Sequence, residues 1–597
     1  MAETVSDQLL QRLHDWGVRR VFGYPGDGIN GVMGALNRMG GAIQFVEAPH
    51  EELTAFMACG HARFTGELGV CIATSGPGAI HLLNGLYDAR ADHQGVLAIV
   101  GQQARAVLGT DYQQEVDLVS LFKDVAHEYV QLAMVPEHVP HLVDRAVRIA
   151  RNQRTVTCLI LPHDLQDLPA TAARDGKHAE TLTGMGTTAR ALVPAQDGLE
   201  AAAAVLNAGR RVAILVGAGA LHATEEVLAV AERLGAGVAK ALLGKAVVPD
   251  HLPFVTGTVG MLGTQPSWEL MEGCDTLLMV GSSFPYSEFL PKAGQARGVQ
   301  VDIDGRRLGL RYPFEVNLQG DSRATLRALL PLLQPKSDRS WQQQVAANVA
   351  RWSELLEARA LEDAQPVNPQ RLFHELSPRL PDECLIGCDT GTVTHWFATH
   401  LRLRGGMQAA ISGGLSTMGP ALAYALAGKF AHPRRPALAI VGDGAMQMLG
   451  NNALILLARC WRAWADPRFV VLVLNNGELN LVTWEMRATL GDPKYPASQD
   501  LPAFPYAEYA RLLGLEAIRV DHLDQLVPAL EQAFAAARPV VVEVVTDPNV
   551  PPLPPHVEPQ QARHFVRAML RRDPDALQVL RAAAKQWWAG IGRNSSR

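Results

Sequence analysis

The sequence predicts an α/β protein made of three consecutive doubly wound, Rossmann-like parallel sheets. Three observations support this prediction. Continuous apolar runs of strand length recur along the chain, as expected for strands buried on both faces of a sheet. These runs alternate with helical segments, and several of them lead into glycine turns. At 597 residues the chain is also too long for a single hydrophobic core.

The first unit is expected over residues 1–175, as an N-terminal domain. Its strands are predicted from short apolar runs at residues 21–25, 69–73, 97–101 and 157–161. The stretch that follows, residues 167–198, is polar, rich in alanine and threonine, and lacks periodicity. Such composition predicts a linker to the next unit.

The second and third units follow the same pattern. Apolar runs at residues 211–216, 276–281 and 299–304 predict a central domain over residues 190–340, followed by a helical connector. Runs at residues 437–441 and 469–474 predict the third domain, over residues 366–550. Residues 551–597 open with a proline-rich stretch and are expected to form an arm and a helix.

Composition excludes several classes of protein. The chain is 48% hydrophobic and 19% charged, as in ordinary globular proteins, and its net charge of −6 predicts no nucleic-acid partner. Its seven cysteines form no metal-binding cluster, so we expect free thiols in a reducing compartment. The N-terminus is polar and acidic, and no apolar run approaches the ~20 residues of a membrane span. A cytoplasmic protein is therefore expected.

The most informative motif is a Gly-Asp-Gly turn between two strands. Asp443 follows one apolar run, and Asn476 closes the next run after a helical segment. Parallel strands joined through a helix end at the same sheet edge, where ligands bind. A carboxylate, an amide oxygen and a nearby carbonyl suit a hard divalent cation that also carries a diphosphate. A Gly-Asp-Gly alone is usually a tight turn, and a second copy contains Asp27.

With its flanking strands and closing Asn-Asn pair, the segment resembles the thiamine-diphosphate motif of the acetolactate synthase and pyruvate oxidase family. The resemblance extends over roughly residues 4–590 and implies a pyrimidine-binding, a central and a diphosphate-binding domain. It also implies thiamine diphosphate held through Mg²⁺. The implied metal ligands are Asp443, Asn476 and the carbonyl of Glu478, and the implied diphosphate contacts are Gly442, Gly444 and Ala445.

A second motif concerns the carboxyl group that thiamine chemistry needs. The segment around His50-Glu51-Glu52 resembles the family segment whose glutamate hydrogen-bonds N1′ of the aminopyrimidine and promotes loss of the C2 proton. The resemblance assigns this role to Glu51. Such a carboxyl group works best in a poorly solvated pocket. The alternative is that both glutamates are solvated acids in the first turn of a helix, where the helix dipole favours them.

Further cofactor contacts are implied by shorter resemblances. Ser416, Thr417 and Met418 resemble the loop whose large apolar residue supports the bent cofactor, although a lone methionine is more often core filler. The other implied contacts are the turn of Ser75, Gly76 and Gly78, the strand-end turn of Thr390 and Gly391, and the pair Leu481 and Val482.

The glycine turn at residues 217–220 follows a strand, but such a turn alone is weak support for a bound cofactor. Residues 257–263, 281–286 and 301–304 resemble, in order and spacing, the FAD-contacting segments of bacterial pyruvate oxidases and of the quinone-linked pyruvate dehydrogenase. The implied contacts are Gly217, Gly219, Gly260, Met261, Leu262, Gly263, Gly281, Ser282, Ser283, Phe284, Pro285, Val301, Asp302 and Asp321. The alternative is a structural domain without a flavin.

The resemblance implies oxidative decarboxylation of a 2-oxo acid, with pyruvate as the expected substrate and acetate or acetyl phosphate as product. Electrons would pass through FAD to an acceptor such as quinone or O₂. Gln114 and Glu485 align with active-site residues of pyruvate oxidases, but Gln113, Asn480 and Leu481 depart from the family pattern. These departures should enlarge and polarise the pocket.

Two other functions stay open at this point. One is an acetolactate-synthase-like carboligase with a structural FAD, for which Trp484 lies one residue from a tryptophan that selects the second substrate. The other is a non-catalytic cofactor-binding or regulatory subunit.

The resemblance also implies a homodimer or homotetramer whose active sites combine domains from two chains. In the tail, Leu577, Leu580, Ala584, Trp587 or Trp588, and Ile591 fall at helical spacing. This stripe indicates either peripheral contact with the inner face of a membrane, as in the quinone-linked relative, or packing on the chain's own subunit.

Overall fold

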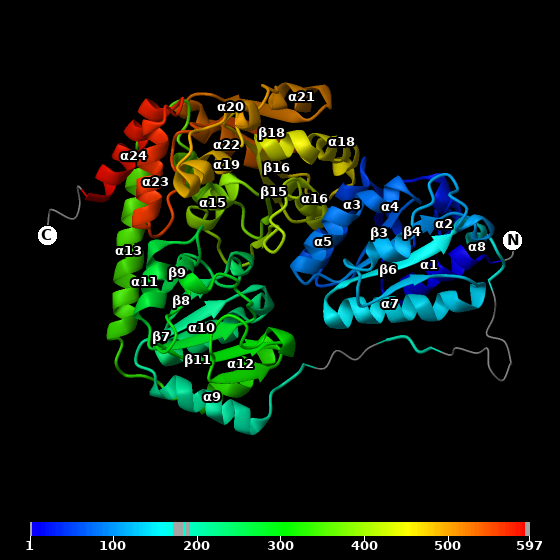
Figure 1. Cartoon of the computed structure of the whole chain (residues 1–597), viewed down its shortest axis with the longest axis horizontal. Helices are drawn as coiled ribbons and strands as arrows, with labels where there is room; N and C mark the ends of the chain where they lie inside the picture. The colour runs from blue at the N-terminus through cyan, green and yellow to red at the C-terminus, as the bar shows by residue number, and fades with distance from the viewer. Residues whose placement is uncertain (1–2, 171–182, 187–190, 592–597) are drawn as a thin grey trace.

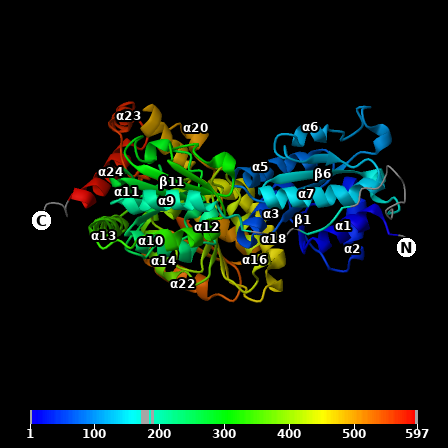
Figure 2. The ribbon, with the colours of Figure 1, turned by 90° about the horizontal axis from the view of Figure 1, so that it is seen from below.

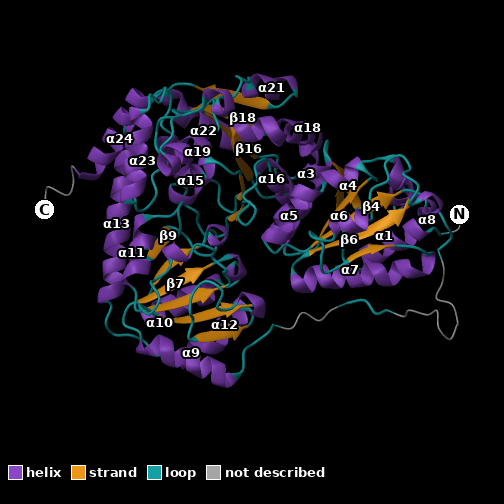
Figure 3. Cartoon of the chain, in the orientation of Figure 1, coloured by secondary structure: helices purple, strands orange, loops and turns teal. Residues whose placement is uncertain are grey.

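The computed structural model describes residues 3–170, 183–186 and 191–591, and the side chains of these ranges up to residue 586. It contains three parallel sheets of six strands each, with helices packed on their faces (Figure 1 and Figure 3). The α/β fold class with three doubly wound sheets is therefore confirmed. The first sheet lies at one end of the molecule in both views (Figure 1 and Figure 2).

The first sheet has the strand order β2-β1-β3-β4-β6-β5. Its strands are β1 (Arg20–Gly23), β2 (Gln44–Glu47), β3 (Gly69–Ala73), β4 (Val96–Gln102), β5 (Val130–Leu132) and β6 (Val156–Pro162). Its helices are α1 (Val5–Asp15), α2 (Asn30–Arg38), α3 (Glu51–Thr65), α4 (Pro77–His81), α5 (Leu83–Ala91), α6 (Leu118–Phe122), α7 (Val139–Gln153) and α8 (His163–Gln166).

The second sheet has the order β12-β11-β10-β7-β8-β9. Its strands are β7 (Val212–Val216), β8 (Gly237–Lys240), β9 (Val255–Thr258), β10 (Thr276–Val280), β11 (Arg297–Asp302) and β12 (Val316–Gln319). Its helices are α9 (Gln196–Ala208), α10 (Thr224–Leu234), α11 (Gln265–Gly273) and α12 (Ser322–Leu329), followed by the connector α13 (Ser340–Ala360). Strand β11 ends two residues before the predicted end, because the Asp304 side chain accepts the N–H of Arg306 and starts a turn.

The third sheet has the order β14-β13-β15-β16-β18-β17. Its strands are β13 (Leu385–Cys388), β14 (Gln408–Ala410), β15 (Ala437–Gly442), β16 (Phe469–Asn475), β17 (Glu516–Val520) and β18 (Val540–Val545). Its helices are α14 (Pro369–Arg379), α15 (Thr392–Thr399), α16 (Ala421–Ala431), α17 (Asp443–Ala445), α18 (Asn451–Cys460), α19 (Asn480–Glu485), α20 (Pro496–Gln499), α21 (Tyr506–Leu512) and α22 (Leu526–Ala535).

Helix α3 of the first unit packs against α16 of the third unit. The approach is close because the contact surfaces carry small residues: a Cβ on Gly60 would lie 2.9 Å from the Cα of Tyr424, and one on Gly428 would lie 3.0 Å from the Phe64 ring. The second pair lies four residues further along both helices than the first, so the two helices run in the same direction. The start of α3 therefore lies at the same end as the loop that precedes α16.

A buried ion pair holds that loop in place. Asp92 accepts the backbone N–H groups of Gly413 (3.0 Å) and Gly414 (2.6 Å), and it pairs with Arg63. The Arg63 guanidinium also donates to the carbonyl oxygen of Ile411 at 2.8 Å. Both side chains are almost fully buried. The first unit thus fixes the backbone just before Ser416.

Asp389, at the end of β13, provides a pH-dependent term in stability. Its carboxylate is fully buried and accepts the N–H groups of Thr390, Gly419 and Ala421. Burial outweighs these bonds and raises its pKa from 3.8 to about 6. The native state therefore binds the proton more tightly than the unfolded state, so the contribution is complete below the unfolded pKa and is lost as pH rises through the folded pKa.

We expect the free energy of unfolding of the cofactor-free protein to fall by up to about 3 kcal/mol between pH 4 and 6 from this residue alone. Chemical denaturation of the wild type and of Asp389→Asn across this range measures the effect. The variant should be less stable than the wild type at pH 4, since one backbone N–H loses its acceptor, and its pH slope should be flatter. Equal slopes in the two proteins would contradict the assignment.

The C-terminal arm returns to the third unit through the helices α23 (Pro559–Leu570) and α24 (Ala576–Ile591). On its way, the His556 ring stacks on Trp268 of the central unit at 5.2 Å. The arm then covers the π-helical segment Met486–Leu490 that follows α19 (Figure 1). There the guanidinium of Arg487 donates two hydrogen bonds, of 2.8 and 2.7 Å, to the buried carboxylate of Asp573.

Breaking this pair should release the arm. Asp573→Ala leaves the Arg487 guanidinium buried without its main partner, a change that costs about 3–5 kcal/mol in comparable sites. We expect faster hydrogen–deuterium exchange in α23 and α24. Asp492→Ala is the matched control, because it removes an exposed pair with Arg571 that contributes less than about 1 kcal/mol. Equal exchange in the two variants would show that the buried pair does not hold the arm.

Within the described residues, no helix has the length and apolar character that crossing a membrane requires. Helix α24 contacts the connector α13, and its Val579 is fully buried. Leu577 and Leu580, by contrast, are 70% and 45% exposed. The helix thus packs on its own subunit with Val579, while part of the predicted apolar stripe faces outward. The side chains of residues 587–591 lie outside the described residues.

Candidate active site

Asp443 lies where β15 ends and α17 begins. Strands β15 and β16 pair in parallel with Gly442 opposite Leu474, so Asp443 and Asn476 follow neighbouring strand ends as predicted. The carboxylate accepts the N–H of Gly444 at one oxygen, and those of Asn476 (2.9 Å) and Gly477 (2.7 Å) at the other. Burial outweighs these bonds and raises the pKa of Asp443 to about 6.

In the described part of the chain, no lysine or arginine side chain pairs with Asp443. A buried carboxylate held by backbone N–H groups, without a protein counter-charge, fits a divalent cation. Its neighbour Asn476 uses its side-chain oxygen to accept the N–H of Glu478 at 3.1 Å. Asn475 turns the other way and donates to Glu543, so only the second amide of the pair belongs to this site.

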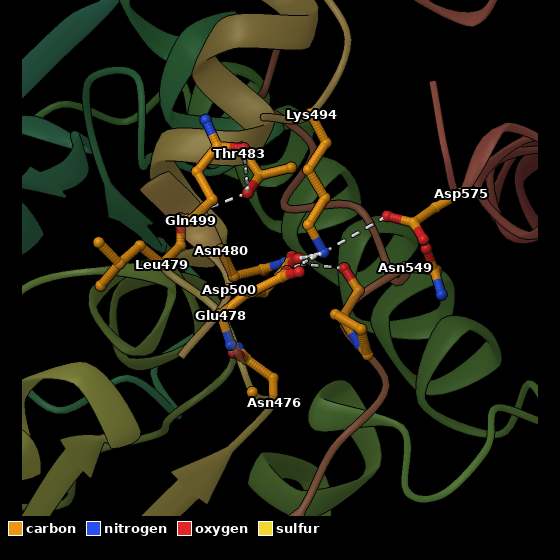
Figure 4. A network of polar contacts seen from close by, with 12 residues as sticks. Asn476, Glu478, Leu479, Asn480, Thr483, Lys494, Gln499, Asp500, Asn549 and Asp575 are labelled. Carbon is orange, nitrogen blue, oxygen red and sulfur yellow. Dashed lines mark hydrogen bonds and ion pairs between the residues drawn. The ribbon is translucent and has the colours of Figure 1, made fainter. Parts of the chain in front are cut away.

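Glu478 was predicted as a carbonyl ligand of the metal, a role that stays a prediction. Its carbonyl oxygen accepts the N–H of Asn480, while its buried carboxylate pairs with Lys494 and the Asn480 amide (Figure 4). Lys494 also contacts Asp500 at 2.8 Å and Asp575 of the tail at 3.6 Å. Burial lowers the pKa of Lys494, but its bonds to Asp500 and Glu478 outweigh burial and raise it. The Glu478 charge is thus neutralised within the protein.

Met418, predicted to support the cofactor, reaches the start of α17. A Cβ on Gly444 would lie 3.1 Å from the Met418 methyl carbon and 2.8 Å from Leu479. Ser416, two residues before, has a positive φ of 58°, an uncommon conformation for a residue with a side chain. Leu479 was not predicted to lie at this site, because the sequence around it shows only an apolar residue without a motif. Tyr506 was also missed, although its hydroxyl donates to the Asp443 carbonyl at 3.0 Å.

Glu51 is the first residue of α3 and is buried, which excludes a solvated acid. The preceding His50 caps the helix by accepting the N–H of Glu52 at its Nδ1 atom. Gly78 lies against the carboxyl group: a Cβ there would be 3.1 Å from Oε1 of Glu51 and 2.7 Å from Thr74. A larger residue at position 78 would therefore crowd both Thr74 and Glu51.

Ser75, Gly76 and Gln114 gather beside this turn. The Ser75 hydroxyl donates to the Gln114 side chain at 3.3 Å, and Gly76 and Gln114 both have positive φ, 59° and 60°. Asn84 connects this group to the third unit, since its amide donates to Glu52 (2.6 Å) and to the Thr417 hydroxyl (3.0 Å). One chain therefore links the Glu51 region to the Met418 loop, and the two-chain active site stays a prediction.

The remaining predicted residues of the third unit differ in exposure. Gly391 has φ 126° with open space where a Cβ would point, and it follows Thr390 at the end of β13. Leu481 is half-buried and Val482 exposed, while burial raises the pKa of Glu485. Trp484 is buried under the tail and stacks on Phe565, so the comparison with a substrate-selecting tryptophan does not fit its position.

In the central unit, the predicted glycines contact each other. A Cβ on Gly217 would lie 2.4 Å from the Gly281 carbonyl oxygen, and the Gly219 N–H donates to that oxygen at 2.9 Å. This close backbone packing alone explains these glycines. Gly260 has φ 114°, and a Cβ on Gly263 would lie 2.7 Å from its carbonyl oxygen.

The side chains predicted to contact FAD have mixed surroundings. Ser282, Phe284 and Val301 are buried, whereas Leu262 and Ser283 are half-buried and Met261 and Pro285 exposed. Burial raises the pKa of Asp302, whose carboxylate accepts the N–H of Asp304. Asp321 caps α12 by accepting the N–H of Ala324 at 2.9 Å. Helix capping thus explains an aspartate at this position without a bound flavin.

Comparison with known proteins decides the family. Three family models match: the thiamine pyrophosphate enzyme N-terminal TPP binding domain (residues 3–121), central domain (199–329) and C-terminal TPP binding domain (389–544). The chain belongs to the thiamine pyrophosphate enzyme family. The sequence resemblance is thereby confirmed. The N-terminal TPP binding domain contains Glu51, and the C-terminal one contains Asp443 and Asn476.

Individual members of the family are similar along nearly the whole chain. The putative thiamine pyrophosphate-containing protein YdaP of Bacillus subtilis is 34% identical over 95% of this chain and 96% of its own. A pyruvate oxidase of Lactiplantibacillus plantarum is 28% identical over 90% and 87%. A probable acetolactate synthase large subunit of Methanocaldococcus jannaschii is 28% identical over 92% and 93%.

Proposed function

We propose that this chain is an enzyme that uses thiamine diphosphate, Mg²⁺ and FAD to decarboxylate a 2-oxo acid oxidatively, with pyruvate as the expected substrate. The observation that carries the proposal is the buried Asp443 carboxylate, which follows a strand end at a helix start and has no counter-charge among the residues that the structure describes. Backbone N–H groups hold this carboxylate rigidly before any ligand binds.

Asp443 and Asn476 would hold Mg²⁺, with Gly444 and Ala445 near the diphosphate at the start of α17. When bound, the coenzyme supplies the electron sink for decarboxylation. Met418 and Leu479 would support it from the Gly444 side. Glu51, buried beside Gly78, would hydrogen-bond the aminopyrimidine ring and hold or release a proton at its carboxyl oxygen.

The substrate pocket is proposed around Gln114, Leu481 and Glu485. Burial raises the pKa of the Glu485 carboxyl group above its ordinary value, which favours its protonated form more than in a freely solvated glutamate. Of the three departures from the family pattern, Asn480 donates its amide to Glu478 and to the Pro548 carbonyl, so it supports the backbone. Gln113 and Leu481 are the remaining candidates for a wider, more polar pocket.

FAD is proposed at the carboxyl edge of the second sheet. The strand-end glycines Gly217, Gly219 and Gly281 bring the backbone close together there, and the exposed Met261 and Tyr286 offer apolar contact area. These features are compatible with a flavin ring. Electrons would leave FAD for an acceptor such as quinone or O₂, with acetate or acetyl phosphate as product.

A carboligase is the second candidate, because the acetolactate synthase relative is as similar as the pyruvate oxidase. Anaerobic addition of pyruvate to the reconstituted protein separates the two. Rapid bleaching of the flavin absorbance supports oxidation, whereas acetolactate without bleaching supports ligation. If neither occurs with any of a panel of 2-oxo acids, the proposed reaction is wrong.

Assembly as a homodimer or homotetramer is proposed from the family plan, and sedimentation measures it. Peripheral membrane contact through α24 is supported by the exposed Leu577 and Leu580 and by the neighbouring Arg581. Pelleting with liposomes, with and without residues after Asp573, tests the contact. Binding that survives the truncation would place it elsewhere.

A further inference from the structure

His81 contacts Glu51, although neither its position nor its neighbours predicted this from the sequence. It is the last residue of α4, and its Nδ1 atom lies 3.0 Å from Oε2 of Glu51. Its ring also stacks on that of His50, with centroids 4.7 Å apart and planes inclined by 25°. Within the described residues, His81 contacts two titratable side chains, those of Glu51 and His50. The nearby carboxylate of Glu52 is held by Asn84.

The two partners differ sharply in exposure. The Glu51 side chain is 10% exposed, whereas the His81 side chain is 46% exposed. On its other side, Glu51 faces the backbone of Gly78, where a Cβ would lie 3.1 Å from Oε1. The imidazole of His81 is thus a direct connection between the buried carboxyl group and solvent.

Glu51, His50 and His81 offer ligand atoms within 4.8 Å of one another, which raises the question of a metal site. Two features argue against it. His50 already uses Nδ1 to accept the N–H of Glu52. The stacked rings also lie in nearly parallel planes, and a metal ligated by imidazole lies near the plane of each ring, so one ion does not suit both.

We propose that His81 is a positioning residue for Glu51 that also carries protons between this carboxyl group and solvent. The inference rests on the proposed function, in which Glu51 contacts the aminopyrimidine. In the outward direction, the Glu51 carboxylic acid gives its proton to Nδ1 of His81, and Nε2 of the resulting imidazolium releases a proton to water. The carboxylate and a neutral imidazole remain, and the reverse transfers restore the starting state.

The test measures proton exchange separately from turnover. Wild type and the variants His81→Asn and His81→Ala are loaded with thiamine diphosphate and Mg²⁺, without substrate. Deuterium exchange at C2 of the bound coenzyme is followed by acid quench and NMR, and coenzyme affinity by calorimetry. We expect both variants to bind the coenzyme within about 3-fold of wild type and to exchange at least about 10-fold more slowly, within the range of general acid–base catalysis. Added imidazole should restore exchange in His81→Ala.

The matched control is His127→Asn, which changes another exposed histidine paired with a glutamate, at 45% exposure. Its exchange rate should equal that of wild type. Wild-type exchange rates in both His81 variants would overturn the role of His81 while leaving the proposed function intact. Slow exchange that imidazole does not restore, together with weakened coenzyme binding, would reduce His81 to a structural contact. Failure of the wild type to bind the coenzyme would overturn both proposals.

Discussion

Replacing Asp443 by Ala is expected to weaken the Mg²⁺-dependent binding of thiamine diphosphate by two orders of magnitude or more (~100-fold) and to abolish turnover. The reason is geometric as well as electrostatic. The carboxylate is held by the backbone N–H groups of Gly444, Asn476 and Gly477, so its oxygens are positioned before the metal arrives. An alanine removes both the charge and the acceptor that orders the Asn476 turn. Calorimetric titration of coenzyme with and without Mg²⁺ measures the loss.

The same residue predicts how metal affinity depends on pH. Burial raises the pKa of Asp443 to about 6 in the metal-free protein, and a metal binds the ionised form. Mg²⁺ affinity should therefore be constant above this pKa and fall by up to about 10-fold per pH unit below it. The same Mg²⁺ affinity at pH 5 and pH 7.5 would contradict the assignment of Asp443 as a ligand.

The amide pair supplies a matched control for this prediction. Asn476→Ala should weaken Mg²⁺ binding, because this residue follows β16 beside Asp443. Asn475→Ala, one residue earlier, removes a hydrogen bond to the buried Glu543 and should lower stability while leaving the Mg²⁺ requirement unchanged. If both variants lost Mg²⁺ binding equally, the effect would be structural and the ligand set would need revision.

The second large effect is expected at Glu51. Glu51→Gln keeps the size and a hydrogen-bonding group but cannot exchange a proton with the aminopyrimidine, so C2 exchange and turnover should fall by about 10²–10⁴-fold. The side chain is buried against Gly78, so the glutamine should remain in place and coenzyme binding should change much less than the rate. Rapid-quench exchange and steady-state kinetics measure the two quantities separately.

Glu67→Gln is the control, since Glu67 lies just beyond the other end of the same helix and its side chain is 70% exposed. It should leave exchange and turnover unchanged. A Glu51→Gln protein that turns over at the wild-type rate would remove Glu51 from the reaction, whatever the outcome at Asp443.

Local pattern was sufficient for the fold class and for placing Asp443 and Asn476 after neighbouring strands. The apolar run that forms β15 and the amide pair after β16 predicted the neighbouring strand ends of Asp443 and Asn476, because parallel strands joined by a helix have only this arrangement. Helical spacing likewise predicted α24. The predicted domain boundaries and the roles of the site residues stay predictions, since fold and family membership alone test neither.

The sequence patterns did not predict contacts between distant segments of the chain. Trp484 is one example: its place in the chain suggested the substrate pocket, but its ring stacks on Phe565 of the arm. The glycines of the central unit are another, because Gly217 and Gly281 meet each other across neighbouring strand ends. A glycine in a turn signals only that something comes close, and not whether that is backbone or ligand.

By itself, the sequence determined the three parallel sheets, the carboxylate and amide at one strand edge, and a glutamate at a helix start. Periodicity and turn chemistry depend on residues that are close together in the sequence, so these features can be predicted from short segments. Only the tertiary structure decided that Glu51 is buried against His81, that Asn84 links Glu52 to Thr417, and that Lys494 neutralises Glu478. Such pairings depend on how separate helices pack, and the free energy of burying a charge depends on partners that no local pattern encodes.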